Sequence, residues 1–214
     1  MPDIGGEVLA TRVAFLELRD ERRLVQEGYE LLDEKRVLLA TEILRRLAGY
    51  RARRDEWLRG WRAARSALAA ALAAHGVEGA QLQPAVLRAL RLEVGIQRIA
   101  GVALAAVEPR EQPAAGPPAP AAVPVWPSSA LEACTTAFRT LVPLTVQLAA
   151  DERNLRRLAR EYVRTDRRAR ALENVLLPEL DDALSFVEEQ LEYMDAEEAV
   201  RVHEAQRRID GAGG

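Results

Sequence analysis

The sequence predicts an all-α fold, a long antiparallel two-helix coiled coil with a small irregular or short-hairpin middle region. Two observations lead to this fold class. The N-terminal and C-terminal thirds each carry an apolar stripe with helical spacing, and a proline-rich stretch separates them. Neither helix can bury its stripe alone in water, so each is the natural partner of the other. The composition agrees, because aromatic residues make up only 5% of the chain and charged residues 29%.

The N-terminal region, residues 1–75, is predicted to be one long helix. It is expected to start near Glu7 and to run to about Ala74, with His75 and Gly76 as the stop signal. At about 1.5 Å per residue, such a helix is roughly 100 Å long. Its stripe has the i, i+3, i+4, i+7 spacing and comprises Leu24, Val25, Gly28, Leu31, Leu32, Lys35, Leu38 and Leu39. The glycine on this stripe indicates a close approach of the partner helix.

The middle region, residues 76–127, breaks the helical pattern. A short helix is expected over residues 84–94, with Pro84 in its first turn. Residues 95–107 are rich in Ile and Val and predict a strand or a hairpin. Residues 109–127 hold seven prolines and predict a loop or an extended polyproline segment.

The C-terminal region, residues 128–214, is predicted to be the second long helix. Ser128 or Ser129 is expected to cap it, with reinforcement from Glu132, and it is expected to end near Asp210. Pro143 and Pro178 predict kinks, because proline removes a backbone hydrogen bond and clashes with the preceding turn. After the second proline the apolar residues follow a heptad spacing, at Leu180, Leu184, Val187, Leu191 and Met194.

The charges are distributed in blocks. The net charge of −3 gives the whole chain no bias toward nucleic acid. Residues 153–170 nevertheless hold eight arginines, and residues 171–200 hold ten acidic residues without any Lys or Arg. The arginines fall on several helix faces, Glu161 and Asp166 interrupt them, and Tyr162 is the only aromatic residue among them. An acidic protein partner therefore explains the basic block better than nucleic acid does, and a solvated helix face is the plainer alternative.

Few residues suggest chemistry. His75 and His203 lie far apart and have no carboxylate or cysteine pair at a ligand spacing, so no metal site is expected. The sequence has no GxxxxGK[ST] or GxGxxG motif to hold a phosphate, and no cofactor is expected. Cys134 is the single cysteine, and we expect it to be a packed or idle thiol and not a nucleophile. Because the sequence has neither a signal-peptide pattern nor a run of 18 apolar residues, we expect a cytoplasmic protein without direct membrane insertion.

Two motifs resemble a known family. Residues 164–180, RTDRRARALENVLLPEL, are similar to the C-terminal signature of the D subunit of vacuolar- and archaeal-type rotary ATPases. The matching residues are Arg167, Arg168, Ala171, Leu172, Glu173 and Pro178. Near the N-terminus, Thr11-Arg12 and GYELLDEKRVLL (28–39) resemble the opening signatures of the same family. The resemblance covers both long helices, in the right order.

This resemblance implies a central rotor shaft that takes part in ATP synthesis and hydrogen-ion transport. In such a shaft, the terminal halves of the coiled coil enter the catalytic head, the middle binds a membrane-proximal socket subunit, and a small subunit clasps its side. The expected partners are therefore the catalytic and regulatory head subunits and those two stalk subunits. The shaft itself is expected to be non-catalytic, to transmit torque, and to sit at the membrane periphery as part of the complex. A non-rotary coiled-coil tether or adaptor is the alternative.

We expect the partner contacts to involve Arg12, Lys35, Arg36, Arg167, Arg168 and Glu173. If Arg12 lies opposite residue 197, then Lys35 lies opposite Glu173, and these two side chains are expected to pair. In the same register, Arg167 and Arg168 face Ala40 and Thr41, where the first helix offers little negative charge. These two arginines are therefore expected to contact an external acidic or carbonyl-rich surface.

Overall fold

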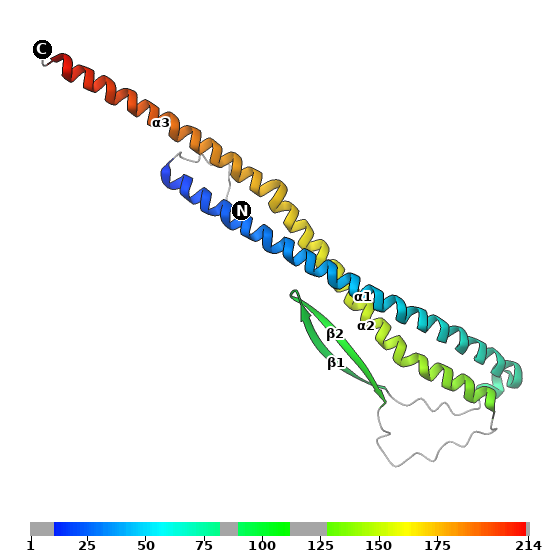
Figure 1. Cartoon of the computed structure of the whole chain (residues 1–214). Helices are drawn as coiled ribbons and strands as arrows, with labels where there is room; N and C mark the ends of the chain where they lie inside the picture. The colour runs from blue at the N-terminus through cyan, green and yellow to red at the C-terminus, as the bar shows by residue number, and fades with distance from the viewer. Residues whose placement is uncertain (1–10, 82–89, 112–127, 213–214) are drawn as a thin grey trace. The chain divides into compact units, whose positions relative to one another are not determined.

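The computed structural model of the protein describes residues 11–81, 90–111 and 128–212. Helix α1 spans Arg12–Gln81, followed by the strands β1 (Leu90–Ile99) and β2 (Val102–Glu111). Helix α2 (Ser129–Ala171) continues through a π-helical turn, η1 (Leu172–Leu176), into α3 (Leu177–Ala212) (Figure 1). The middle region thus contains a two-stranded antiparallel sheet, and the prediction of an all-α chain is wrong in this respect. None of the described helices is long and apolar enough to span a membrane.

Local side-chain chemistry sets the helix ends. The Thr11 hydroxyl accepts a hydrogen bond from the Ala14 amide (3.1 Å), so α1 begins five residues later than predicted. Gly76 has a φ of 68°, which interrupts the helix where a stop was expected, although helical turns resume up to Gln81. At the start of α2 the Ser128 hydroxyl accepts a hydrogen bond from the Leu131 amide (3.4 Å), which identifies Ser128 as the cap.

The strands form a hairpin that confirms one prediction and corrects another. Residues 95–107 were expected to contain a strand or hairpin, and β1 pairs with β2 from Leu90↔Glu111 to Ile99↔Val102. The turn consists of Ala100 and Gly101, which both have positive φ, as a two-residue hairpin loop requires. Residues 90–94, expected in a short helix, belong to β1 instead. Pro109 lies within β2, because both strands of a two-stranded sheet are edge strands and tolerate proline. The remainder of the predicted helix and polyproline segment lies outside the described residues.

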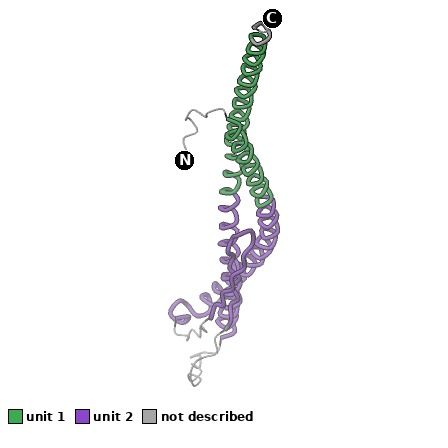
Figure 2. The backbone as a smooth tube through the Cα atoms, turned by 90° about the vertical axis from the view of Figure 1, so that its left-hand side faces the viewer, with its two compact units in different colours: residues 1–36, 163–214 green, residues 37–162 purple. Residues whose placement is uncertain are grey.

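The chain divides into two units, which Figure 2 shows in different colours. The first combines residues 1–36 and 163–214, and the second comprises residues 37–162. In the first unit α1 lies antiparallel to the chain segment from residue 163 onward, since successive α1 residues meet earlier and earlier residues of that segment. The buried residues facing α1 in this unit are Thr165, Ala169, Leu180 and Val187. Leu180 and Val187 confirm the predicted heptad seam, whereas Met194 at its end is exposed.

Two clusters hold the second unit together. Leu39, Leu104 and Leu158 are fully buried against one another, and they bring α1, β2 and α2 into one core. Farther along α1, Trp57 stacks on Trp61 with ring centroids 5.7 Å apart. Trp61 in turn meets the edge of Phe138 on α2. Aromatic pairs of this kind each add about 1 kcal/mol beyond the burial of their area.

Candidate functional site

The candidate functional residues of this chain are those predicted to contact partners. Among the residues that the structure describes, no three His, Cys, Asp or Glu side chains gather as ligands for a metal ion. Cys134 is buried, as predicted for a packed thiol. The residues predicted to contact partners all lie in the first unit, on α1, the end of α2 and η1. Their surroundings show which of them are used within the chain and which face outward.

Arg12 and Arg36 are used within the chain. Arg12 forms an ion pair with Asp195 (3.1 Å) in which both side chains are exposed. Arg36 donates a hydrogen bond to Asp166 (3.2 Å), and both of these side chains are largely covered. Between them Arg22 pairs with Asp181. Arginine and aspartate therefore tie α1 to the second helical segment at three levels, each contributing at most about 1 kcal/mol where solvent reaches it.

These pairs correct the predicted register. The prediction placed residue 172 opposite Arg36, whereas Asp166 takes this position, six residues earlier in the chain. Only at Arg12 is the prediction nearly right, since Asp195 lies two residues from the expected position 197. The predicted register, and with it the reason for a Lys35–Glu173 contact, is therefore wrong over most of the first unit. The offset grows from two residues at Arg12 to six at Arg36, so one fixed sum of residue numbers does not describe the pairing.

Glu173 instead faces Tyr29. The Tyr29 hydroxyl donates a hydrogen bond to the Glu173 carboxylate. Burial raises the pKa of Tyr29 above its ordinary value, and the negative charges of Glu173 and Asp33 raise it further. The neighbouring Gly28 leaves room for Leu172, whose Cδ1 would lie 3.9 Å from a Cβ at that position. This is an ordinary van der Waals distance that would also admit an alanine, so the close approach predicted from the glycine is not confirmed.

Arg167 and Arg168 remain free. Both are exposed, and neither forms an ion pair with any residue of the described ranges 11–81, 90–111 and 128–212. Asp166 and Arg170, their neighbours in the basic block, pair with each other (3.1 Å). Two adjacent unpaired guanidinium groups on a helix surface are suited to bind an external carboxylate or backbone carbonyl surface. Their exposure agrees with the prediction of an external contact.

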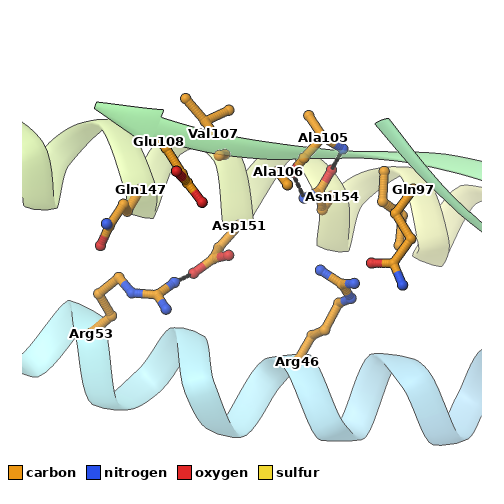
Figure 3. Close-up of a pocket in the computed structure, with 12 residues that line it drawn as sticks. Arg46, Arg53, Gln97, Ala105, Ala106, Val107, Glu108, Gln147, Asp151 and Asn154 are labelled. Carbon is orange, nitrogen blue, oxygen red and sulfur yellow. Dashed lines mark hydrogen bonds and ion pairs between the residues drawn. The ribbon is translucent and has the colours of Figure 1, made fainter. Parts of the chain in front are cut away.

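Sequence reasoning missed the attachment of the hairpin to α2 (Figure 3). The buried Asn154 side chain accepts a hydrogen bond from the Ala105 amide (2.9 Å) and donates one to the Ala105 carbonyl (2.7 Å). Arg157 adds a bond to the Ala103 carbonyl (2.9 Å). Beside this clamp Arg53 of α1 pairs with Asp151 of α2, as Figure 3 shows. The only signal in the sequence was an asparagine at a position where the helical spacing calls for an apolar residue.

Comparison with known proteins identifies the family. The family model of the ATP synthase D subunit matches residues 14–207. The chain belongs to the ATP synthase D-subunit family. It is 28% identical to the A-type ATP synthase D subunit of Methanopyrus kandleri, over 97% of this chain and 89% of that protein. It is 36% identical to the V-type ATP synthase D subunit of Anaeromyxobacter dehalogenans, over 92% and 95%. It is 28% identical to that of Thermus thermophilus, over 96% and 90%.

Family membership confirms the resemblance of the two sequence motifs. In this member of the ATP synthase D-subunit family, the motif residues occupy defined structural positions. Thr11 caps α1, Arg36 pairs with Asp166, and Glu173 bonds to Tyr29. Pro178 directly follows the π-helical turn η1. The C-terminal signature and residues 28–39 thus meet where α1 packs against η1. Among the predicted contact residues, only Arg167 and Arg168 lack an ion pair or hydrogen bond with the described residues.

Proposed function

We propose that this chain is the central stalk subunit of an A/V-type ATP synthase and transmits torque between the catalytic head and the ion-translocating membrane ring. The observation that carries the proposal is the match of the ATP synthase D-subunit family over residues 14–207. The helices also support it. They pack antiparallel within each unit, and both α1 and α2 run through the two units without an intervening loop. A continuous helix transmits twist, since every residue is tied to the next turn by backbone hydrogen bonds.

In this role the chain binds its neighbours and catalyses no reaction. Its partners are the catalytic and regulatory head subunits, a small subunit that clasps the side of the stalk, and a membrane-proximal socket subunit. It stands on the cytoplasmic side and is peripheral to the membrane. The exposed arginines Arg167 and Arg168 support contact with a neighbouring subunit. Residues 196–208 of α3 follow Asp195, the ion-pair partner of Arg12, and they are exposed. Their exposure supports the proposal that the last turns of α3 enter the head.

A light-induced cross-link tests the torque-transmitting role. Val200→Cys in a Cys134→Ala background places a benzophenone–maleimide label on an exposed position of α3. In the assembled complex, this label is expected to form a cross-link to a head subunit. The fraction of ATP hydrolysis activity that is lost is expected to equal the fraction of complexes that carry the cross-link. The same labelled complex kept in the dark is the control. A non-rotary tether predicts full hydrolysis after cross-linking, and that result would reject the proposal.

A further inference from the structure

One face of the hairpin is apolar and exposed although the hairpin does not need it for its own packing. Side chains alternate along a strand, so Leu92, Val94 and Ile96 share one face of β1. The strand register sets Val107 and Ala105 of β2 directly opposite Val94 and Ile96. We call these five residues the apolar face. Leu104, which points to the other side, is the residue that anchors the hairpin in the core. Ile96 is 75% exposed and Val94 60%, so the apolar face presents contiguous apolar surface to solvent.

The apolar face and α2 together form a groove. Its volume is about 520 Å³, and the helix contributes Val146 and Ala149 to its wall. All of these residues belong to the second unit. The groove is lined mainly by apolar residues of the sheet face and of the flank of α2. Its shape therefore suits a helix that inserts apolar side chains more than an added strand.

A row of arginines borders this groove. Arg153, Arg156, Arg157 and Arg160 follow the i, i+3, i+4, i+7 spacing and so lie on one face of α2. They line a second, adjoining hollow of about 460 Å³, which shares Ala149, Arg153 and Arg157 with the first. We call these four residues the arginine row.

Little within the chain neutralises the arginine row. Glu152, the single carboxylate among the described residues that line the hollow, pairs with Arg156 (2.5 Å). Arg157 already donates a hydrogen bond to the Ala103 carbonyl. Arg153 and Arg160 are exposed and have no ion-pair partner among the described residues. Like charges three and four residues apart repel one another, so an acidic ligand lowers the free energy of this surface when it binds.

We propose that the apolar face and the arginine row form one docking groove for an acidic amphipathic helix of another subunit of the complex. An apolar stripe on that helix covers Leu92, Val94 and Ile96, and carboxylates on its flank meet Arg153 and Arg160. Nucleic acid would satisfy the arginines but not the apolar wall. This inference rests on the proposed function, because it takes the partner from the same ATP synthase complex.

Photo-cross-linking of the assembled complex from within the groove tests the inference. Ile96→Cys in the Cys134→Ala background carries a benzophenone–maleimide label, and Arg51→Cys, exposed on α1 of the same unit, carries it as the control. The label at position 96 is expected to mark a peptide of another subunit whose helical pattern combines an apolar stripe with several flanking Asp or Glu residues. Position 51 is expected to leave that peptide unlabelled.

Charge reversal supplies the second readout. Arg153→Glu with Arg160→Glu is expected to reduce the yield of that cross-link about tenfold, because complementary charges set the rate and specificity of association. Arg51→Glu with Arg54→Glu, equally exposed, is expected to leave the yield unchanged. All four arginines are exposed, so each variant is expected to fold. Circular-dichroism melting of each variant checks this.

The outcomes separate the two proposals. If the chain assembles with the ATPase subunits but the label at position 96 marks only this chain, a second copy of it, or a segment without acidic residues, the groove inference is wrong and the stalk function stands. The groove inference is also wrong if the arginine reversal leaves the yield unchanged, or if an intact complex gives no cross-link. If the chain does not co-purify with ATPase subunits at all, both proposals are rejected.

Discussion

At the scale of single residues, two glycines within α1 have different surroundings. A Cβ added at Gly60 would lie 2.8 Å from the Cδ2 of Leu141, which is buried on α2. At Gly49 nothing lies within 4 Å of the same position. Both glycines weaken the helix by about 1 kcal/mol relative to alanine. Only Gly60 has a packing reason to be there.

These surroundings predict opposite effects of alanine. Gly49→Ala is expected to stabilise the chain by about 1 kcal/mol, which raises the melting temperature by roughly 2–4 °C. Gly60→Ala gains the same helix propensity but must displace the packed Leu141 side chain, so it is expected to give no gain or a loss of about 1 kcal/mol. Thermal unfolding followed by circular dichroism measures both. Equal stabilisation by the two variants would contradict the close packing at Gly60.

Glu42 gives the chain a defined acid sensitivity. Hydrogen bonds from Arg45 and Arg46 lower the pKa of Glu42 to about 2, from an ordinary value of 4.5. The group binds a proton more readily in the unfolded chain, so its contribution to stability is complete above about pH 4.5 and is lost as the pH falls toward 2. Glu42→Gln is expected to cost about 1 kcal/mol at pH 7 and nearly nothing at pH 2.

Urea unfolding of this variant and of the parent chain at both pH values measures the difference. Glu56→Gln, an exposed position on the same helix, is the matched control and is expected to have little effect at either pH. A Glu42→Gln effect of equal size at pH 7 and pH 2 would show that the arginine contacts are not its cause.

At the scale of elements, the π-helical turn corrects the phase of the second helix. The Leu177 amide bonds to the Leu172 carbonyl, five residues back, so η1 absorbs one extra residue. Ahead of it the buried positions are Thr165 and Ala169, and beyond it they are Leu180 and Val187. An uninterrupted α-helix would turn the latter pair about 100° away from α1. The wide turn also lies where the Pro178 ring would clash with the Asn174 carbonyl.

This geometry predicts that Pro178→Ala keeps the π-helical turn in the folded chain. Closing the turn would expose Leu180 and Val187, which costs more than one recovered hydrogen bond. The change in stability is expected to stay within about 1 kcal/mol, although an isolated helical peptide gains helix content from the same change. Hydrogen exchange at residues 172–178 of the full chain measures the outcome.

A one-residue deletion provides the matched comparison. Deleting the exposed Asn174 together with Pro178→Ala removes both the extra residue and the proline, and is expected to leave a regular helix with the seam in phase. Deleting Asn174 with the proline retained is expected to cost about 3 kcal/mol, because the ring then meets an α-helical carbonyl. If Pro178→Ala alone closed the turn, the proline and not the seam would be its cause.

The elements differ in how far the sequence could predict them. The long helices were predictable because dozens of residues repeat one spacing, and Ser128 and Gly76 mark their ends. Residues 90–94 alternate apolar and charged side chains, which is a strand pattern, but five residues are few and Pro84 suggested the first turn of a helix instead. The strand at these residues depends on pairing with β2 and on the Asn154 clamp, and both are contacts between distant parts of the chain. In the sequence, the π-helical turn is visible only as a one-residue shift in the spacing of the apolar residues.

At the scale of the whole molecule, Arg167 and Arg168 predict a separation of assembly from folding. Changing both to Glu removes no ion pair that the structure shows among its described residues. Helix content and melting temperature are therefore expected to change little, whereas assembly with neighbouring subunits or ATP-driven rotation is expected to weaken. Circular dichroism and co-purification measure the two properties. Unchanged assembly and turnover would mean that this part of the basic block is only a solvated face.

Arg164→Glu is the matched control, as an exposed arginine of the same block that lies outside the Arg167–Arg168 pair. Its reversal is expected to leave both folding and assembly intact. If it weakens assembly as much as the double change does, the general positive charge of the block is responsible and not the two adjacent guanidinium groups.

The family could be recognised from the sequence, but the use of its motif residues could not. Short signatures at the right separation sufficed for recognition, and the family match confirms it. The same signatures gave Arg12 and Arg36 as partner contacts, and the structure shows each of them in an ion pair within the chain. Which charged residues face inward depends on the helix register, and the apolar stripe alone did not determine it, since the ion pairs depart from the predicted register by two residues at Arg12 and six at Arg36.

Four ion pairs between α1 and the second helical segment have the same polarity. In Arg12–Asp195, Arg22–Asp181, Arg36–Asp166 and Arg53–Asp151 the arginine comes from α1 and the aspartate from the later helix. During translation α1 emerges first, with its leucines uncovered, and a second nascent copy of α1 is its nearest wrong partner. Such a homotypic pair would leave these four arginines without the aspartates that they meet in the later helix. The four ion pairs thus favour pairing of α1 with the C-terminal half of its own chain over association with another nascent copy of α1 on a neighbouring ribosome.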